Sequence, residues 1–392
     1  MVAIDIQTKT FAQFVFHRSP PLFDELPFKI LNIQLLQNQE SLLQIASIWR
    51  DLAVGMPFRQ PEWLLSWWET YQNDSMELFV VVVRDDEDRI RAIAPWYLDL
   101  PTRTIRFLGD GKVCTDHASI IVDSRFHFES PIKRLVEYLI QGNRTKFAWT
   151  SIHLEAVNAS DTVLQSFQSA MLRQGCNCYR SKLANTWQVV QPDGWDAFLE
   201  GLSKNARKMF RKRAADLDQV RINWVQDKAD LADFLPVLTD LHQRRRNSLG
   251  DEGCFADPKF SAFLALASER LLERNQLQAF SLWLDGQPIA ADIGFRSPDR
   301  WLCYQAGIDP GKMDREPGKL ANVYILKNAE RFGIRTVDFL RGDEPYKQQL
   351  KADPHPVQDL RFSRPGIRGK TKYLGWQTRE WMKSIAKRMR RK

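Results

Sequence analysis

The stretch that decides the fold runs from Gln278 to Lys351; it begins with QAFSLWLDGQPIAADIGF at residues 278–295 and contains DFLRGDEPYK at residues 338–347. Its first part predicts three strands, at residues 279–284, 288–295 and 301–307. Asp285-Gly286 joins the first two strands, and this dipeptide favours the type I′ turn of a hairpin. A loop rich in Pro and Gly, a helix over residues 320–332 and a strand over residues 336–340 follow. The predicted order is three strands, an irregular loop, a helix and a fourth strand.

The loop at residues 309–319 predicts an anion-binding site. A helical crossover makes the last strand parallel to the one before it, so the loop and the helix N-terminus meet at one strand end. The first helix amides lack internal acceptors and carry partial positive charge. Gly318 allows close approach of a ligand, and Lys312, Arg315 and Lys319 add formal charge. We interpret this loop as a pyrophosphate cradle, although a capped helix with solvated basic residues has the same pattern. Its glycine spacing fits neither a Walker loop nor a Rossmann fingerprint.

The stretch resembles the acyl-CoA-binding core of the GNAT N-acyltransferases, and in particular the CelD/BcsL-type branch linked to cellulose and exopolysaccharide biosynthesis. The segments that carry the resemblance are residues 284–290, 304–307, 317–320 and above all 338–347. The usual GNAT loop, Q/R-x-x-G-x-G/A, is absent from this sequence. The resemblance implies acetyl-CoA or another acyl-CoA as co-substrate, with its pyrophosphate on the helix N-terminus. The implied cofactor-binding residues are Tyr304, Lys312, Arg315, Gly318, Lys319 and Leu320.

Length, charge and cysteine content bound the remaining possibilities. A chain of 392 residues predicts two domains. Residues 366–392 carry ten Lys or Arg and one Glu, so they account for the whole net charge of +8 and the rest of the chain is close to neutral. Five cysteines without a CxxC or a zinc-type Cys/His spacing predict a reducing compartment and no metal site. No signal peptide or membrane-spanning run is visible, and we expect a cytoplasmic protein.

Both halves of the sequence read as helices, hairpin, strands, helix and strand. This order predicts an α/β fold with a mixed sheet, built from two tandem GNAT-like units as in the related Fem peptidyltransferases. The expected parts are a lead-in (1–28), an N-terminal unit (29–190), a C-terminal acyltransferase unit (191–365) and a basic amphipathic tail (366–392). Since only the second half has a basic Pro/Gly loop, we expect one cofactor site there, with the first unit supplying a wall of the acceptor pocket.

Acyl transfer from a thioester to an amine requires a proton acceptor for the amine, stabilisation of the oxyanion and a proton donor to the thiolate. Residues 341–347 follow the last strand, at the edge where open α/β sheets bind ligands. Tyr346 is the candidate general acid, as often in GNAT enzymes, and Asp343 or Glu344 the candidate base. Lys347 is a candidate for neutralising the oxyanion or a substrate phosphate. Alternatively, Asp338, Arg341 and Lys347 form a structural ion-pair network.

Two further segments carry candidate residues. Asp116-His117 offers a second candidate base, although a lone histidine is more often structural. The basic run at residues 203–213 predicts an amphipathic helix, and the resemblance favours contact of Ser203, Asn205 or Arg207 with substrate. Arg341 is a further candidate for binding substrate. Residues 244–255 predict a mobile loop beside the same pocket.

These observations favour a cytoplasmic acyl-CoA-dependent N-acyltransferase, with an amine on a sugar, a nucleotide-sugar or another small molecule as acceptor and a role in polysaccharide biosynthesis. A Fem-like transferase that uses aminoacyl-tRNA, or a non-catalytic scaffold of a polysaccharide-synthesis assembly, are the alternatives. In the tail, Leu374, Trp381, Ile385 and Met389 fall on one helical face. Such a basic amphipathic helix suits an anionic membrane surface, nucleic acid or an acidic partner; a disordered end or a helix packed on the body is the alternative.

Overall fold

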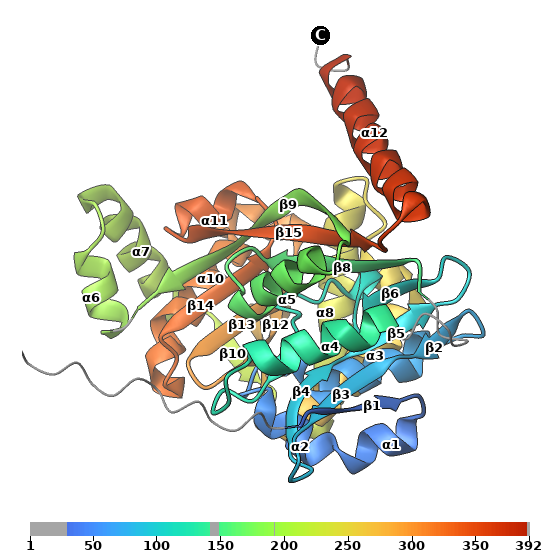
Figure 1. Ribbon diagram of the computed structural model, residues 1–392. Coiled ribbons are helices and arrows are strands. Elements are labelled where there is room, and N and C mark those ends of the chain that lie inside the picture. Colours follow the sequence, from blue (N-terminus) through green and yellow to red (C-terminus); the bar gives the residue numbers. More distant parts are fainter. Residues whose placement is uncertain (1–29, 142–148, 192, 390–392) are drawn as a thin grey trace, which may run out of the picture. The chain divides into compact units, whose positions relative to one another are not determined.

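The computed structural model describes residues 30–141, 149–191 and 193–389 (Figure 1). The predicted lead-in, residues 1–28, lies outside them. Leu31–Lys392 form one compact unit. Its strands in the N-terminal half are β1 (Asn32–Leu36), β2 (Met76–Leu78), β3 (Val80–Arg84), β4 (Ile90–Ala94), β5 (Trp96–Asp99), β6 (Thr104–Phe107), β7 (Ile121–Val122), β8 (Ser151–Asn158) and β9 (Asn177–Val190). Those in the C-terminal half are β10 (Arg221–Trp224), β11 (Leu277–Leu284), β12 (Gln287–Arg296), β13 (Arg300–Ile308), β14 (Thr336–Arg341) and β15 (Asp353–Ser363).

Helices cover these strands. In chain order they are α1 (Gln39–Gln44), α2 (Ala46–Leu52), α3 (Pro61–Tyr71), α4 (Glu129–Gln141), α5 (Thr162–Arg173), α6 (Gly194–Glu200), α7 (Lys204–Asp216), α8 (Lys228–Ser248), α9 (Pro258–Leu272), α10 (Pro317–Asn328), α11 (Pro345–Gln349) and α12 (Ile367–Met389). The arrangement confirms the predicted α/β class. None of the helices in the described ranges is both long and apolar enough to cross a membrane.

The stretch that decided the fold has the predicted element order. Asp285 and Gly286 both have positive φ, 53° and 76°, as the type I′ turn requires. The helix begins earlier than predicted, at Pro317, and its last predicted turn is a 3-10 turn over Ala329–Phe332. The prediction of an irregular loop before it was wrong, because Pro310–Arg315 form a 3-10 helix. Asp309 caps this helix by accepting a hydrogen bond from the Gly311 amide (2.9 Å), and Pro310 supplies a pre-set φ at its first position.

The two halves exchange their last strands. The large sheet has the order β10-β11-β12-β13-β14-β9-β15-β8-β6-β5-β2. β9 belongs to the first half but pairs with β14 of the second, while β15 of the second half pairs with β8 of the first. The two exchanged strands also pair with each other, and Figure 1 shows them side by side. Outside this centre, β11-β12-β13-β14 and β2-β5-β6-β8 repeat the same antiparallel, antiparallel, parallel sequence of pairings.

The parallel pair β13/β14 separates after a short contact. Only Arg300, Trp301 and Leu302 pair with β14, although β13 continues to Ile308. A register shift between β12 and β13 also leaves Tyr304 without a partner on β12, since Ile293 pairs with Gln305 and Gly294 with Cys303. The two strands therefore diverge into a wedge with unpaired backbone on its edges.

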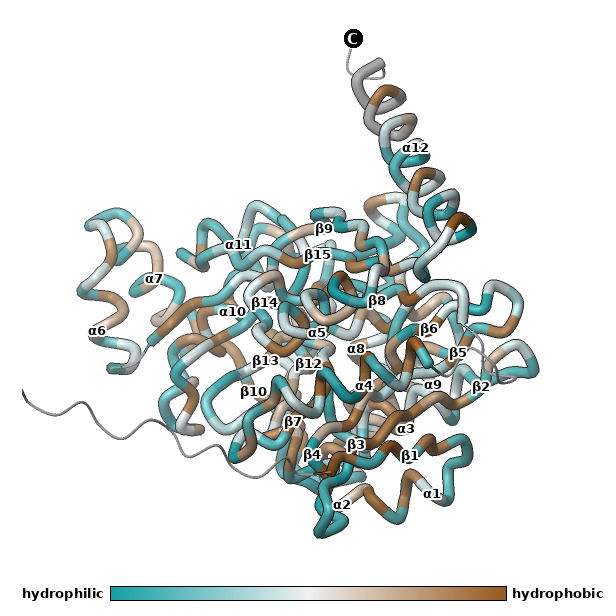
Figure 2. The backbone as a smooth tube through the Cα atoms, viewed as in Figure 1, coloured by the Kyte–Doolittle hydropathy of each residue, from teal (hydrophilic) through white to brown (hydrophobic). Residues whose placement is uncertain are grey.

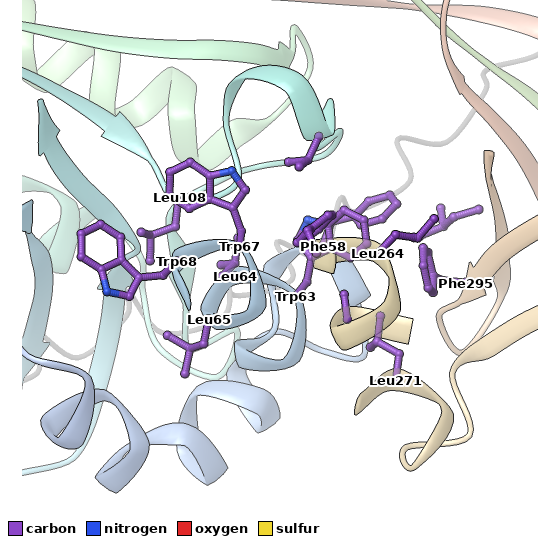
Figure 3. Close-up of a cluster of buried hydrophobic side chains, with 14 of the residues drawn as sticks. Phe58, Trp63, Leu64, Leu65, Trp67, Trp68, Leu108, Leu264, Leu271 and Phe295 are labelled. Carbon is purple, nitrogen blue, oxygen red and sulfur yellow. The ribbon is translucent and has the colours of Figure 1, made fainter. Parts of the chain in front are cut away.

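A buried aromatic cluster joins the two halves beside this wedge. Trp63 of α3 is fully buried, and its ring lies 4.7 Å from that of Phe263 on α9 and 5.3 Å from that of Phe295 on β12. Figure 3 shows Trp63 and Phe58 facing Leu264 and Phe295, and Figure 2 shows the hydrophobic colouring concentrated along α3 and the neighbouring strands. Burying aromatic rings of this size is strongly favourable, so the cluster fixes the first half against β12 and α9.

Candidate active site

A cavity of about 680 Å³ lies in the wedge between β13 and β14. Its walls come from residues 303–308 of β13, residues 339–341 of β14, the first turn of α10, and α8. Cys114 and Asp116 of the first half also line it, and the expected role of that half in an acceptor pocket stays a prediction. The volume falls within the range of pockets that bind a ligand of cofactor size.

The first turn of α10 forms one end of this cavity. Pro317, Gly318 and Lys319 line it, as predicted for Gly318 and Lys319. The N-cap residue is Glu316, which has φ of +49° and makes no side-chain hydrogen bond to the helix amides. The free amides of this turn therefore remain available to an anion. A Cβ built on Gly318 would lie 3.5 Å from Ile308 Cγ2, an ordinary contact, so the fold itself does not require glycine there.

Glu316 holds two cations at the same helix end. Its carboxylate forms ion pairs with Arg213 of α7 and with Lys319. The hydrogen bond from Lys319 is the largest influence that lowers the pKa of Glu316, with Arg213 also contributing. The structure does not place Lys312 or Arg315 on the cavity wall; Arg315 lies 3.6 Å from Asp314 instead. Lys319 is thus the predicted cradle cation that the fold brings to the site.

Two other predicted cofactor-binding residues, Leu320 and Tyr304, make contacts that stabilise the fold. Leu320 is 3% exposed; its side chain points from α10 into the hydrophobic core and does not line the cavity. Tyr304 lines the cavity, but its hydroxyl donates a hydrogen bond to the Val113 carbonyl at 2.6 Å. Burial raises the pKa of Tyr304 well above its usual range. Its ring contacts those of Phe58 and Trp63, so Tyr304 extends the aromatic cluster to the pocket wall.

The Asp116-His117 pair connects the two halves through β14. His117 Nε2 lies 2.9 Å from Asp338 Oδ2, and Asp338 also accepts hydrogen bonds from Gln188 (2.8 Å) and from the Leu340 amide (2.9 Å). Asp116 accepts a hydrogen bond from the Arg341 amide (2.8 Å) and pairs with the Arg341 guanidinium (3.2 Å). Burial raises the pKa of Asp116, although Arg341 opposes this. Asp116 and Arg341 reach the cavity, whereas His117 does not line it.

Lys347 has the environment of a structural cation. It is 2% exposed, and its Nζ donates to the carbonyls of Leu340 (3.1 Å), Arg341 (3.2 Å) and Gly342 (3.0 Å). Its ammonium also pairs with Glu344 at 2.9 Å. These contacts hold the turn after β14, where Leu340 has φ of +54°. The geometry therefore favours the structural alternative for Lys347, and its catalytic role stays a prediction.

The other candidate residues after β14 differ in whether they line the cavity. Tyr346 lines the cavity with its side chain 41% exposed, and desolvation together with the charge of Glu344 raises its pKa above the usual range. Asp343 does not line the cavity. It accepts hydrogen bonds from Asn185 (2.7 Å) and Trp187 (3.1 Å), and these bonds, Asn185 first, lower its pKa. The fold thus brings Tyr346 and Glu344, but not Asp343, to the site.

The predicted substrate residues of α7 lie away from the cavity wall. Ser203 caps α7 by accepting from the Ala206 amide at 3.4 Å, and Asn205 is exposed. Arg207 donates to the carbonyls of Leu199 (2.9 Å), Glu200 (2.8 Å) and Leu202 (3.1 Å), so it caps the C-terminus of α6. Met209 is the α7 residue that reaches the cavity. The loop predicted at residues 244–255 is largely regular, because α8 extends to Ser248 and a 3-10 turn covers Cys254–Ala256.

Sequence reasoning missed two buried titratable residues on the cavity wall. His242 of α8 is 3% exposed, its Nδ1 lies 3.1 Å from Gln243 Oε1, and burial lowers its pKa. Asp292 of β12 is 3% exposed, and burial raises its pKa to about 7. A single acidic residue within the apolar strand run at residues 288–295 was the sequence signal for Asp292. Within the described ranges, no group of three or more His, Cys, Asp or Glu side chains could hold a metal ion.

Comparison with known proteins agrees with this geometry. Residues 203–348 match the family model described as "Acetyltransferase (GNAT) domain". No curated protein matches the sequence. FemX is similar in structure with a TM-score of 0.57 and 11% identity, covering 84% of this chain and 96% of that one. A conserved protein of unknown function from Bacteroides thetaiotaomicron VPI-5482 gives a TM-score of 0.52 at 10% identity, covering 85% and 100%.

A tandem GNAT protein from the clavulanic acid biosynthesis pathway gives a TM-score of 0.48 at 14% identity, covering 86% of this chain and 99% of that one. At such identities, the likeness to FemX and to the Bacteroides protein shows the fold alone. The family match covers α7 to α11 and therefore includes every strand and helix that forms the wedge. Residues 203–348 therefore form a GNAT-type acetyltransferase domain, and the protein is an acyltransferase.

Proposed function

We propose that the protein transfers an acetyl or longer acyl group from acyl-CoA to the amine of a small acceptor. The observation that carries this proposal is the cavity where the diverging β13 and β14 meet the uncapped N-terminus of α10. A thioester is already activated, so binding and orientation account for much of the rate. Acyl-CoA is the co-substrate that a GNAT domain implies.

The residues of the wedge fit such a co-substrate. The unpaired edge of β13 offers backbone donors and acceptors to the amides of a pantetheine arm. The amides of Gly318 and Lys319, with the Lys319 ammonium, hold the pyrophosphate, while Arg245 and Arg246 add positive charge on the same cavity. Binding of the anion then replaces Glu316 as the partner of Lys319. Tyr346 keeps its proton, because its pKa is raised, and it donates that proton to the departing thiolate.

The finer identity of the acceptor rests on the sequence resemblance. We infer an amine on a sugar or nucleotide-sugar, and a role in polysaccharide biosynthesis, from the likeness of residues 338–347 to the CelD/BcsL-type branch. The composition of the tail supports binding of the protein to an anionic membrane surface. Its helix α12 leaves Leu374 57% and Trp381 64% exposed, beside many basic residues.

Calorimetric titration with acetyl-CoA tests the proposal. We expect binding in the micromolar to millimolar range of enzyme substrates. The Gly318→Val variant should bind at least about tenfold more weakly, since a branched side chain obstructs the approach of phosphate to the α10 amides. Gly375→Val is the matched control, because Gly375 is also helical but has open space around it in α12. Binding of tRNA without binding of acetyl-CoA would replace the proposal by a Fem-like function, and binding of neither would favour a scaffold.

A further inference from the structure

Asp292 is a buried carboxylate to which the described residues provide no hydrogen-bond partner at Oδ1. It lies on β12, in register with Phe280 of β11 and Ala306 of β13, and lines the cavity. Its Oδ1 has neither solvent contact nor a hydrogen-bond partner, and no described side chain forms an ion pair with it. Burying an unpaired carboxylate is costly, and here burial alone raises the pKa to about 7. Such a group calls for a ligand that brings a donor or a positive charge.

The charges around the cavity show what kind of ligand this is. The other three carboxylates on its wall already have protein cations: Asp116 pairs with Arg341, Glu316 with Arg213 and Lys319, and Glu344 with Lys347. Asp292 is the cavity carboxylate for which the described residues supply no cation. The cavity thus has a cationic end at α10 and α8, suited to phosphates, and one uncompensated negative group on its β12 wall.

Asp292 and the candidate acid Tyr346 line the same cavity. Desolvation raises the pKa of Tyr346, Glu344 adds to this, and the negative charge of Asp292 contributes less to the same shift. Burial first, and then the charge of Asp292, raise the pKa of Cys303 on β13. A bound group that interacts with Asp292 therefore lies in the same cavity as Tyr346, the residue that donates a proton to the departing thiolate under the proposed function.

We propose that Asp292 binds the protonated amine of the acceptor and accepts its proton. This assignment rests on the proposed acyl transfer and defines the acceptor as a cationic primary amine. The ammonium group passes one proton to the Asp292 carboxylate. The amine nitrogen then forms the C–N bond with the thioester carbonyl carbon, and the C–S bond breaks. The thiolate takes the Tyr346 proton, the second amine proton restores Tyr346, and Asp292 releases its proton to solvent.

Thermal unfolding near pH 8 tests the binding half of this assignment without knowing the natural acceptor. The probe is n-propylammonium chloride, with potassium chloride and 1-propanol at equal concentration as controls for salt and for the alkyl chain. We expect propylammonium to raise the Tm of the wild-type protein by at least about 2 °C over both controls. Asp292→Asn should abolish this difference, and Asp292→Ser provides a second variant if Asp292→Asn does not fold.

Asp285→Asn is the matched control. Asp285 is exposed in the β11–β12 turn, and Asn tolerates its positive φ, so this variant should respond to propylammonium like the wild type. An equal response of wild type and Asp292→Asn, including no response in either, overturns the assignment.

Titration with acetyl-CoA separates this inference from the proposed function. We expect Asp292→Asn to bind acetyl-CoA as the wild type does. Loss of acetyl-CoA binding in Asp292→Asn means that Asp292 contacts the co-substrate and also overturns the assignment. Failure of the wild type to bind acetyl-CoA defeats the proposed acyl transfer, whereas the propylammonium measurement still decides whether Asp292 receives an ammonium group.

Discussion

Tyr346 and Asp292 line the same cavity, and desolvation raises the pKa of both in ways that serve opposite purposes. A phenol with a raised pKa stays protonated at neutral pH and remains a donor. A carboxyl group with a pKa of about 7 changes its protonation state in the physiological range and is suited to accept a proton.

Tyr346→Phe should lower kcat by about a hundredfold or more while changing the affinity for either substrate little. The hydroxyl acts on charge that develops only as the thiolate leaves, so its loss affects the transition state and not the bound ground state. Steady-state kinetics and acetyl-CoA titration measure the two effects. Tyr138→Phe, on α4, is the control. An unchanged kcat would reduce Tyr346 to a packing residue.

Asp292→Asn should change how stability depends on pH. In the folded protein the pKa of Asp292 is about 7, above its ordinary value of 3.8. The wild type therefore binds more protons when folded, and its stability falls as pH rises from about 4 to about 7. This loss is on the order of 4 kcal/mol and is absent from the variant. Urea unfolding of both proteins across that range measures the difference, and parallel curves would contradict the buried, unpaired state of Asp292.

Among the elements, β13 depends on the close approach of α8. A Cβ on Gly307 would lie 2.5 Å from the His242 amide nitrogen and 2.9 Å from the Leu238 carbonyl oxygen. Both atoms belong to the backbone of α8 and cannot rotate away. Glycine is thus required at this position for α8 to form the cavity wall that carries His242.

Gly307→Ala should destabilise the protein by about 1–3 kcal/mol, the typical cost of overpacking a close contact. It should also weaken acetyl-CoA binding, because α8 must move away from β13. Gly318→Ala is the matched control for stability, since its Cβ meets Ile308 only at an ordinary distance of 3.5 Å. Denaturant unfolding compares the two variants, and a wild-type midpoint for Gly307→Ala would show that α8 shifts without cost.

At the scale of the whole molecule, the exchange of β9 and β15 makes the two halves depend on each other. β14 requires β9 as its neighbour, and β15 has β9 on one side and β8 on the other. A half produced alone would expose long unpaired strand edges. The boundaries at residues 190 and 365 stay predictions, because the sheet is continuous across them.

Residues 191–392 expressed alone should aggregate or remain unfolded, whereas co-expression with residues 1–190 should yield a folded complex. The physical reason is the loss of both neighbours of β15 and of the β9 partner of β14. Size-exclusion chromatography and circular dichroism distinguish the outcomes. A monomeric, folded 191–392 fragment that binds acetyl-CoA would contradict this dependence.

Deletion of residues 366–392 should abolish salt-sensitive sedimentation with phosphatidylserine vesicles and leave acetyl-CoA binding unchanged. Each basic residue near an anionic surface contributes about 1 kcal/mol, and the tail carries ten of them. The start of α12 contacts the body through Lys372, which donates to Ser151 at 2.8 Å, and through the Gly369 carbonyl, which accepts from Ser363 at 2.8 Å, whereas none of the described α12 residues lines the cavity. Phosphatidylcholine vesicles are the neutral control. If the full-length protein does not sediment with anionic vesicles at low salt, the membrane proposal is wrong.

The sequence determined the elements whose signals are local. The Asp285-Gly286 hairpin, the helix that starts at Pro317 and the strand before residues 341–347 follow from turn chemistry and hydrophobic periodicity within a few residues. The order of the predicted elements indicated the α/β class, and the count of charged residues indicated the basic tail. Gly318 and Lys319 at the start of the helix, and Tyr346 after the last strand, line the cavity.

Only the tertiary structure decided which side chains are free to act. Arg207 and Lys347 look like ligand-binding cations in the sequence, but their charges are taken up by carbonyls of α6 and of the turn after β14. Asp292 looks like one acid in an apolar strand, and its significance depends on the lack of a hydrogen-bond partner for its Oδ1 among the described residues. Ion pairing and burial depend on residues far apart in the chain, so no local sequence pattern predicts them. The exchange of β9 and β15 likewise joins distant segments and could not be predicted from local sequence.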